Sequence, residues 1–347
     1  MKSRLIFTLL LSAHWACAQK KDAQEIPYTS FRDKLVLYAD MGFSSSPFSM
    51  KFESANTNIH KLRYRNNIGL VMGLGASYKW FALRLGFTVL GNLKPIAKHG
   101  KTSYFGIGFD FPIKKTYFEF DFRNYQGYAI KNAWQWDDAL TPLAPNYIRP
   151  ETNTLSISLN GWYFNNRDFK MSVLKGKVGH YNKQVFTWYL KGTFNIQGIS
   201  NNESIIPLAL TDSLNTKTRT STLSALDFGV IPGAAYVNRY KNWQYAAMVG
   251  FGPVVQSKFY IVDQETRGFL GLAPRYDIRF IAGYNVPKWF VMVITNFDNK
   301  SIRINDLRYL NSAHTIRVVG GIRLDTKKKK AGGDKDKPER KRRFFKS

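Results

Sequence analysis

Cysteine is nearly absent from this chain, because Cys17 is the single copy among 347 residues. If an N-terminal segment that contains it is removed, no disulfide and no cysteine-ligated metal can form. Long hydrophobic runs are lacking too. Beyond the N-terminal segment, no stretch approaches the ~18 apolar residues that a membrane-spanning helix needs, which excludes a helical transporter.

Recognisable catalytic motifs are also missing. The chain has five histidines, none with the spacing of metal ligands, and it has no P-loop, G-x-S-x-G or H-E-x-x-H sequence. We therefore predict that the protein is not an enzyme and that it binds no cofactor and no metal. A hydrolase built into a barrel would have only two pairs to use, His180 with Ser172 and His99 with Ser103.

The N-terminus has the three parts of an export signal. Two basic residues precede an apolar run at 5–11, and a small-x-small site ends at Ala18. We predict a signal peptide over 1–18. A lipidated Cys17 is the alternative, and the histidine and tryptophan just before it count against that interpretation.

The body of the chain alternates with a period of two. In 117–123, phenylalanines face one way while Glu119, Asp121 and Arg123 face the other. The same alternation occurs at 82–89, 103–111, 154–161, 275–283 and 315–325. A soluble sandwich alternates as well. Segments of ~10 residues, with a polar face that mixes glycine, serine and both signs of charge, favour an all-β, closed, antiparallel transmembrane barrel instead.

Aromatic residues beside the short turns strengthen this prediction. Rings at headgroup depth form girdles around membrane barrels. We predict such a girdle from Tyr78, Trp80, Trp162, Tyr163, Tyr240, Trp243, Trp289 and Phe290.

The connection lengths predict a topology. Short connections are expected at 78–81, 112–116, 165–168, 238–242 and 286–288, and long ones at 44–66, 91–102, 131–151, 264–273 and 298–312. Outer-membrane barrels place short turns in the periplasm and long loops outside. We therefore predict a barrel over 34–325 with both termini periplasmic, between a periplasmic segment at 19–33 and a tail at 326–347.

The strand count depends on two weaker segments. Strands at 168–177 and 184–197, with an extra crossing at 204–210, give about 14 strands. Pro207 weakens the extra crossing, since proline cannot donate to a strand ladder. Twelve strands is the alternative count.

Alternation also predicts which charges face the lumen. The basic candidates are Arg84, Arg123, Lys191, Arg275, Arg279, Arg317 and Arg323, and the acidic ones are Asp40, Asp110, Glu119, Asp121, Asp227 and Asp277. Nearly balanced signs can pair into a network that stabilises the wall. The competing interpretation is a solute path ordered by Arg279, Arg317 and Arg323.

Two features of the long loops suggest contacts outside the membrane. Lys61, Arg63, Arg65, Lys94, Lys98 and Lys101 could dock the phosphates of membrane lipid or surface glycolipid, or could simply be solvated. In loop 131–151, Trp134, Trp136, Asp137 and Asp138 are candidates for ligand contact, or pack over the barrel mouth.

The C-terminal tail is strongly basic. Residues 327–347 carry 11 basic and 3 acidic side chains and cannot bury a core, so we expect them to be disordered. In the periplasm they would meet anionic partners such as peptidoglycan, inner-leaflet lipid or an acidic protein. An exported chain does not meet nucleic acid, so we expect no such partner.

Short motifs resemble those of a known family. They are His99-Gly-Lys-Thr102, Asn124-Tyr-Gln-Gly-Tyr128, Ile148-Arg-Pro150, Phe164-Asn-Asn-Arg-Asp-Phe169 and Lys183-Gln184. Together they resemble an uncharacterised family of outer-membrane barrel proteins from Bacteroidetes-type Gram-negative bacteria, over 28–325. Glu151 departs from the aspartate expected after Arg-Pro. The resemblance implies fold and location, and it supplies no activity.

These features lead to a functional expectation. We expect an outer-membrane barrel with a structural or accessory role in an envelope assembly, or a narrow passive pore. A protein that binds or adheres through its long loops is the alternative, and an embedded hydrolase is the remaining one.

Overall fold

A computed structural model describes residues 26–326, apart from 56, 69, 89–91, 93, 114, 132 and 137–146. The predicted signal peptide at 1–18, residues 19–25 of the predicted segment at 19–33 and the basic tail from 327 lie outside the described residues. Asp137, Asp138 and the side chain of Trp134 lie outside them as well.

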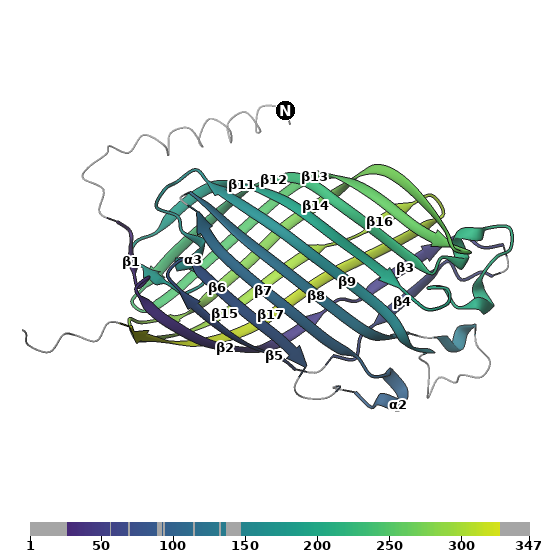
Figure 1. The fold of residues 1–347 in the computed structure, drawn as a ribbon, viewed down its shortest axis with the longest axis horizontal. Helices are drawn as coiled ribbons and strands as arrows, with labels where there is room; N and C mark the ends of the chain where they lie inside the picture. Colours follow the sequence, from purple (N-terminus) through teal and green to yellow (C-terminus); the bar gives the residue numbers. More distant parts are fainter. Residues whose placement is uncertain are drawn as a thin grey trace, which may run out of the picture.

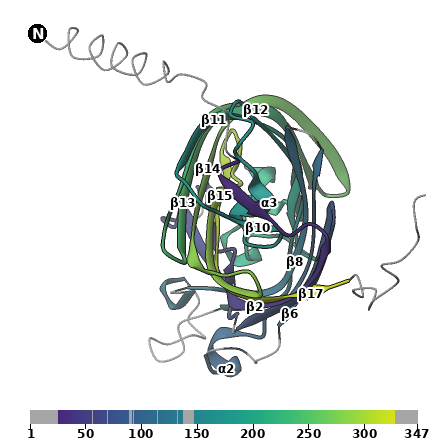
Figure 2. The ribbon, with the colours of Figure 1, turned by 90° about the vertical axis from the view of Figure 1, so that its left-hand side faces the viewer.

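Twelve long strands form a closed, tilted cylinder (Figures 1 and 2). In chain order they are β2 (Lys34–Ser45), β5 (Val71–Tyr78), β6 (Phe81–Thr88), β7 (Ser103–Ile113), β8 (Thr116–Ile130), β9 (Tyr147–Phe164), β11 (Val185–Ser200), β12 (Thr222–Tyr240), β13 (Trp243–Val262), β14 (Glu265–Asn285), β15 (Trp289–Asn299) and β17 (Leu307–Asp325). Each pairs antiparallel with the next, and β17 pairs with β2 to close the ring. The predicted closed antiparallel barrel is confirmed.

The strand count is twelve, the alternative value, and not about 14. Residues 165–184 do not cross the barrel as a strand. They contain the short helix α3 (Met171–Leu174) and the short strand β10 (Gly179–Tyr181). The predicted crossing at 204–210 is also wrong, because it is loop with a single 3₁₀ turn, η2 (Leu208–Leu210). Removing both crossings together leaves the up-and-down order of the other strands unchanged.

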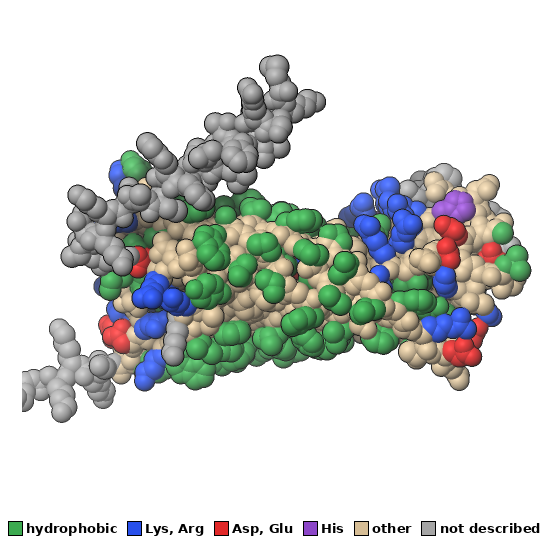
Figure 3. Space-filling model, turned by 90° about the horizontal axis from the view of Figure 1, so that it is seen from above, with side chains coloured by type: hydrophobic (Ala, Val, Ile, Leu, Met, Phe, Trp, Pro, Cys, Tyr) green, Lys and Arg blue, Asp and Glu red, His purple; other side chains and the backbone are tan. Residues whose placement is uncertain are grey.

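Alternation separates a lipid-facing surface from the lumen on every strand. On β12, Phe228 is 63% exposed while its neighbour Asp227 is 0% exposed. Figure 3 shows outward hydrophobic side chains, the hydrophobic belt, along most of the visible face of the cylinder. A closed sheet also pairs its backbone groups without leaving an edge, which a bilayer requires. No helix among the described residues is long and apolar enough to cross a membrane.

The aromatic girdle is reduced at two of its eight predicted positions. Six side chains point outward at the end of the barrel that carries the short turns: Tyr78, Trp80, Tyr163, Tyr240, Trp243 and Trp289. The predictions for Trp162 and Phe290 are wrong, because these side chains are 1% and 0% exposed inside the barrel. Each is adjacent in sequence to an outward ring, so the period of two turns it inward.

Residues 165–184 fill the lumen at the short-turn end, and we call them the plug. Phe169, Met171, Val173 and Leu174 pack there in an apolar core with inward residues of the wall. β10 pairs with β1 (Tyr28–Ser30), so the segment before the barrel is joined to the plug. Figure 2 shows β1, α3 and β10 inside the ring.

A second apolar core closes the opposite end of the barrel. We call this end of the barrel the head. There β3 (Phe48–Phe52) pairs with β17, and β4 (Lys61–Arg65) pairs with β3 and with the end of β8. The Phe48 and Tyr64 rings stack with centroids 4.4 Å apart, and Ile205 and Ile206 pack on the same core. The remaining short elements are α2 (Ile96–His99), η1 (Ala133–Gln135), η3 (Thr216–Arg219) and β16 (Ile302–Ile304).

One predicted long connection is wrong. Strands β13 and β14 continue to a two-residue turn at Asp263–Gln264, where a loop was expected at 264–273. Both turn residues have positive φ, 49° and 69°, as tight hairpin turns require.

A pair of glycine substitutions tests the lumen packing. A Cβ at Gly233 would overlap the Tyr189 ring and the Val249 carbonyl, whereas a Cβ at Gly320 would meet nothing within 4 Å. Gly233→Ala should therefore lower the free energy of unfolding in detergent by about 1–3 kcal/mol. Gly320→Ala is the control and should change it little. Equal effects of the two substitutions would contradict the described packing.

Candidate functional site in the barrel lumen

The thirteen predicted lumen charges lie inside the barrel, each buried or half-buried. They are Asp40, Arg84, Asp110, Glu119, Asp121, Arg123, Lys191, Asp227, Arg275, Asp277, Arg279, Arg317 and Arg323. Alternation along the strands places them, since each neighbours an outward residue in the sequence. Apart from Arg323, which lies at the short-turn end, they form a charged band between the two apolar cores.

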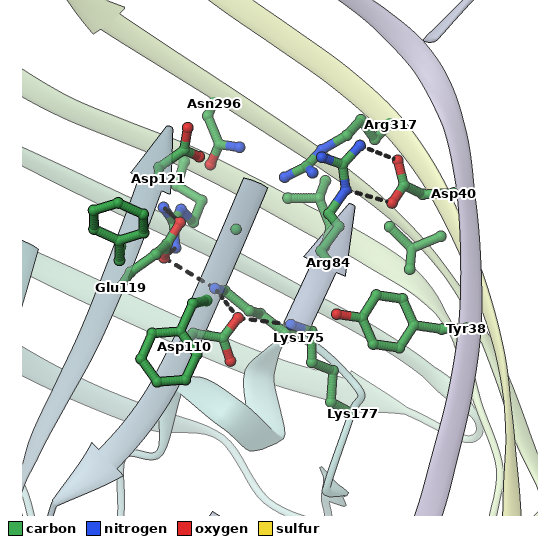
Figure 4. Close-up of a pocket in the computed structure, with 16 residues that line it drawn as sticks. Tyr38, Asp40, Arg84, Asp110, Glu119, Asp121, Lys175, Lys177, Asn296 and Arg317 are labelled. Atoms are coloured by element: carbon green, nitrogen blue, oxygen red, sulfur yellow. Dashed lines mark hydrogen bonds and ion pairs between the residues drawn. The ribbon is translucent and has the colours of Figure 1, made fainter. Parts of the chain in front are cut away.

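The charged band contains small internal spaces. A cavity of about 50 Å³ is lined by Asp40, Arg84, Asp110, Glu119 and Arg317, together with residues of the plug (Figure 4). Two further voids towards the head measure about 10 and 20 Å³. A cavity needs at least ~10–15 Å³ to hold one water molecule, so the first space has room for a few waters and each of the other two for about one.

Two lysines of the plug join it to the barrel wall. The Lys177 Nζ lies 2.6 Å from the Asp110 Oδ2, and the Lys175 Nζ lies 2.9 Å from the Glu119 Oε2. Lys175 also donates to the Tyr117 hydroxyl at 2.8 Å. Figure 4 shows both lysines reaching from the plug towards these carboxylates. The plug is therefore held by charge as well as by apolar packing.

Sequence reasoning missed both lysines because it assigned 168–177 to a strand. A signal was present in that segment. Read with a period of two, Phe169, Met171 and Val173 share a face with Lys175 and Lys177, while the other face mixes Asp168 and Leu174. Neither face is uniformly apolar, so the segment lacks the pattern of a lipid-facing strand.

The wall charges pair with one another. Arg84 donates to both oxygens of Asp40 at 2.6 and 2.7 Å, and Arg123 does the same to Asp121 at 2.6 and 2.8 Å. Such bidentate pairs combine charge with fixed geometry. They give the lumen wall a defined set of contacts without water.

Two further carboxylates have several donors each. Asp277 accepts from the Trp162 indole, the Tyr189 hydroxyl and Lys191, each at 3.1 Å. Asp227 lies 2.5 Å from the Arg275 Nη2 and also accepts from Gln197 and Gln256. The inward turn of Trp162 is thus explained by a polar partner in the lumen.

The predicted solute path of three arginines is not continuous. Arg279 and Arg317 line the same cavity. Arg323 instead lies at the short-turn end, where it donates to the Gly176 carbonyl and to the Asn285 side chain at 2.5 and 2.7 Å. The buried Nε atoms of all three arginines have no hydrogen-bond partner among the described residues.

Two titratable groups of the plug are shifted by their surroundings. Burial lowers the pKa of Lys177, but the nearby Asp110 and Tyr38 raise it more, so the pKa lies above its ordinary value. Burial, with Arg239 and Arg323 adding to it, lowers the pKa of His180 from 6.5 to about 4. Lys177 is therefore charged and His180 neutral at pH 7.

The other predicted sites show no catalytic geometry in the described part of the chain. The His180 Nδ1 and the Ser172 Oγ are both buried without a hydrogen-bond partner, so they do not form a base and nucleophile pair. His99 lies in α2, while Ser103 begins β7. No group of three His, Cys, Asp or Glu side chains that could hold a metal occurs among the described residues.

One predicted loop residue lies at a surface hollow. Trp136 packs at 5.3 Å from the Tyr147 ring and against the head core. Both line a hollow of about 260 Å³ with Arg149, Glu203 and Leu208. Of the four predicted loop candidates, Trp136 is thus the one whose surroundings are described.

Comparison with protein families gives one match. The family model with the description "Domain of unknown function (DUF4421)" matches residues 30–323. None of the curated proteins matches the chain.

Several solved structures are similar in outline. The outer membrane protease OmpT from Escherichia coli is 8% identical, with 85% of this chain and 98% of that chain covered and a TM-score of 0.42. The β domain of the Bordetella autotransporter BrkA is 12% identical, with 84% and 99% covered and a TM-score of 0.32. An outer membrane channel from Pseudomonas putida F1 is 10% identical, with 88% and 100% covered and a TM-score of 0.31. Scores this low carry no conclusion about activity.

A buried and an exposed ion pair give a matched test of the lumen network. Asp227→Asn leaves Arg275 without a counter-charge where the two side chains are 0% and 3% exposed. We expect it to lower the free energy of unfolding in detergent by about 3–5 kcal/mol. The control, Glu265→Gln, removes the acid from the exposed Arg267 pair and should change it by less than about 0.5 kcal/mol. Similar losses in both variants would show that the pair is not sealed from water.

Acid should weaken the plug through His180. In the unfolded chain this histidine takes up its proton near pH 6.5, but in the folded protein only near pH 4. Its contribution to stability is therefore present above pH 6.5 and is lost as the pH falls from there to 4. The urea midpoint of unfolding should fall more steeply between pH 7 and 4.5 in the unmodified protein than in His180→Asn. Identical pH profiles would refute this role.

Proposed function

The chain belongs to the family described as "Domain of unknown function (DUF4421)", and we propose that it is a closed, non-conducting outer-membrane barrel. In this proposal the barrel holds the head at the cell surface, as a structural or accessory component of the envelope. A closed sheet with an outward apolar belt is the strand architecture that a bilayer accepts.

The filled lumen is the observation that carries the proposal. The plug core blocks one end, the head core blocks the other, and paired charges occupy the space between them. The cavity between the plug and the wall charges, about 50 Å³, is far below the size of a water-filled channel. A packed interior favours a rigid barrel over one that lets a solute pass.

The turn lengths support an orientation for this barrel. Outer-membrane barrels have short turns in the periplasm and longer loops outside. By this rule the plug, β1 and the end of β17 face the periplasm. The head, with β3, β4 and β16, then faces the exterior.

A gated conduit is the second candidate, and one specific observation favours it. The plug is a single insert between β9 and β11, held to the wall by Lys175 and Lys177. It could leave the lumen without breaking any pairing between wall strands. Its pairing with β1 would give a periplasmic partner a place to pull.

Conductance across planar lipid bilayers separates the two candidates. We expect no discrete current steps from the folded protein, from Lys175→Gln/Lys177→Gln, or from a variant in which a short Gly-Ser linker replaces 166–183. The reason is that the head core still closes the other end after the plug is removed.

Two results would contradict the closed-barrel proposal. Steady steps from the linker variant, with a closed unmodified protein, would replace our proposal with the gated conduit. Steps from the unmodified protein would refute a closed barrel. The double lysine variant keeps the plug core and therefore guards against a linker variant that does not fold.

A further inference from the structure

Four basic side chains stand in line across neighbouring strands of the head. Arg303 on β16 pairs with Arg308 on β17, Arg308 pairs with Lys51 on β3, and Lys51 pairs with Lys61 on β4. All four are exposed. We call them the basic row.

The four positive charges of the basic row repel one another. Directly paired residues on adjacent strands have Cβ atoms about 4.5–5.5 Å apart, and like charges at such positions are destabilising. With strands about 4.8 Å apart, four charges lie within roughly 15 Å. Hydrophobic burial does not explain such a row, because these side chains point away from the core.

Other basic residues of the head have acidic partners. Lys217 lies 2.8 Å from Asp306, and Arg219 lies 2.8 Å from Asp263. No ion pair joins a member of the basic row to an acid in the described part of the chain. The row is therefore a concentrated positive charge that the protein itself does not neutralise.

The row continues the lipid-facing surface of the barrel. Along β17, Arg308 has the same outward parity as Ile316 and Val318, which are exposed in the belt. In Figure 3, lysine and arginine side chains gather where the hydrophobic belt ends and the head begins. A lipid whose chains contact the belt there has its headgroup next to this side of the head.

We propose that the basic row binds the phosphate groups of a phosphorylated glycolipid in the outer leaflet. Lysine and arginine form strong, charge-assisted contacts with phosphate oxygens. A lipid that carries more than one phosphate matches a row of charges better than a single small anion does. The inference rests on the proposed outer-membrane placement, and it does not depend on whether the lumen conducts.

The row refines the sequence-based expectation about glycolipid. Of the six basic residues predicted for such contacts, Lys61 belongs to the row. Arg63 and Arg65 follow on the same exposed face of β4. Lys94, Lys98 and Lys101 lie instead around α2. Lys51, Arg303 and Arg308 were missed, because their alignment depends on pairing between strands distant in sequence.

The test uses the mature, folded protein in mild detergent. Binding of three probes is measured by isothermal titration: a bis-phosphorylated glycolipid, the same lipid after phosphatase treatment, and inorganic phosphate. Lys51→Gln/Arg308→Gln removes the two central charges of the row. Arg167→Gln/Lys288→Gln is the matched control, since both residues are exposed at the opposite end, Arg167 at the start of the plug and Lys288 in the turn between β14 and β15.

We expect the row variant to bind the phosphorylated glycolipid about twenty-five-fold more weakly, from a factor of about five for each lost charge. The control variant should bind like the unmodified protein. Without lipid, the row variant should unfold at a higher temperature than the unmodified protein, because the repulsion is relieved.

Three results would overturn the proposal. They are equal binding by the row variant and the control, equal binding of the lipid before and after phosphatase treatment, and equally tight binding of inorganic phosphate. The last result would assign the row to a free anion. Because none of these depends on conductance, failure here is distinct from failure of the closed-barrel proposal.

Discussion

The exclusion of water from both faces of the strand wall is the constraint on which the rest depends. In the membrane, the outward face meets hydrocarbon, so the sheet must close and every backbone group must find a partner within it. Inside, the lumen is packed apart from small cavities, so a buried charge needs a counter-charge or other hydrogen-bond partners. Asp227 with Arg275 and Asp40 with Arg84 are the direct consequence. Closure of the sheet and pairing of the lumen charges are two results of one requirement.

The plug follows from the same requirement at the short-turn end. A ring of twelve strands leaves space that its own side chains do not fill, and an open mouth would admit water to the paired charges. The insert between β9 and β11 supplies Met171, Val173 and Leu174 to exclude water. It also supplies Lys175 and Lys177 for Asp110, and Lys175 joins Arg279 of the wall as a basic partner of Glu119. The plug therefore contains both apolar residues that exclude water and lysines that pair with carboxylates of the wall.

Much of the fold could be predicted from the sequence, because lipid on one side and a lumen on the other impose a period of two. That period placed all thirteen lumen charges and six of the girdle rings. The period of two failed to predict those features that local sequence does not determine. Trp162 and Phe290 look like girdle residues until parity is counted from Tyr163 and Trp289. The plug was assigned to a strand because an apolar stretch of its length fits a strand of the wall or an insert in the lumen. The space available in the lumen decides between the two, and local sequence does not report it. Arg323 has the expected inward parity, yet its height along the barrel places it at the plug rather than in the cavity.

Charged side chains are paired with opposite charges inside the barrel, but like charges lie side by side on the head. In the lumen, where the dielectric is low, opposite charges lie at 2.5 to 3.4 Å and most form hydrogen-bonded pairs. On the head, Arg303, Arg308, Lys51 and Lys61 are placed side by side, although the same strands offer positions where an acid would remove the repulsion. This arrangement does not favour folding of the isolated chain, and in our proposal an interaction outside the chain offsets the repulsion. An anionic surface beside the belt provides one, and it would convert an unfavourable row of the isolated protein into a favourable contact in the membrane. The pairing inside makes the barrel rigid, and that rigidity keeps the row at a fixed height above the belt.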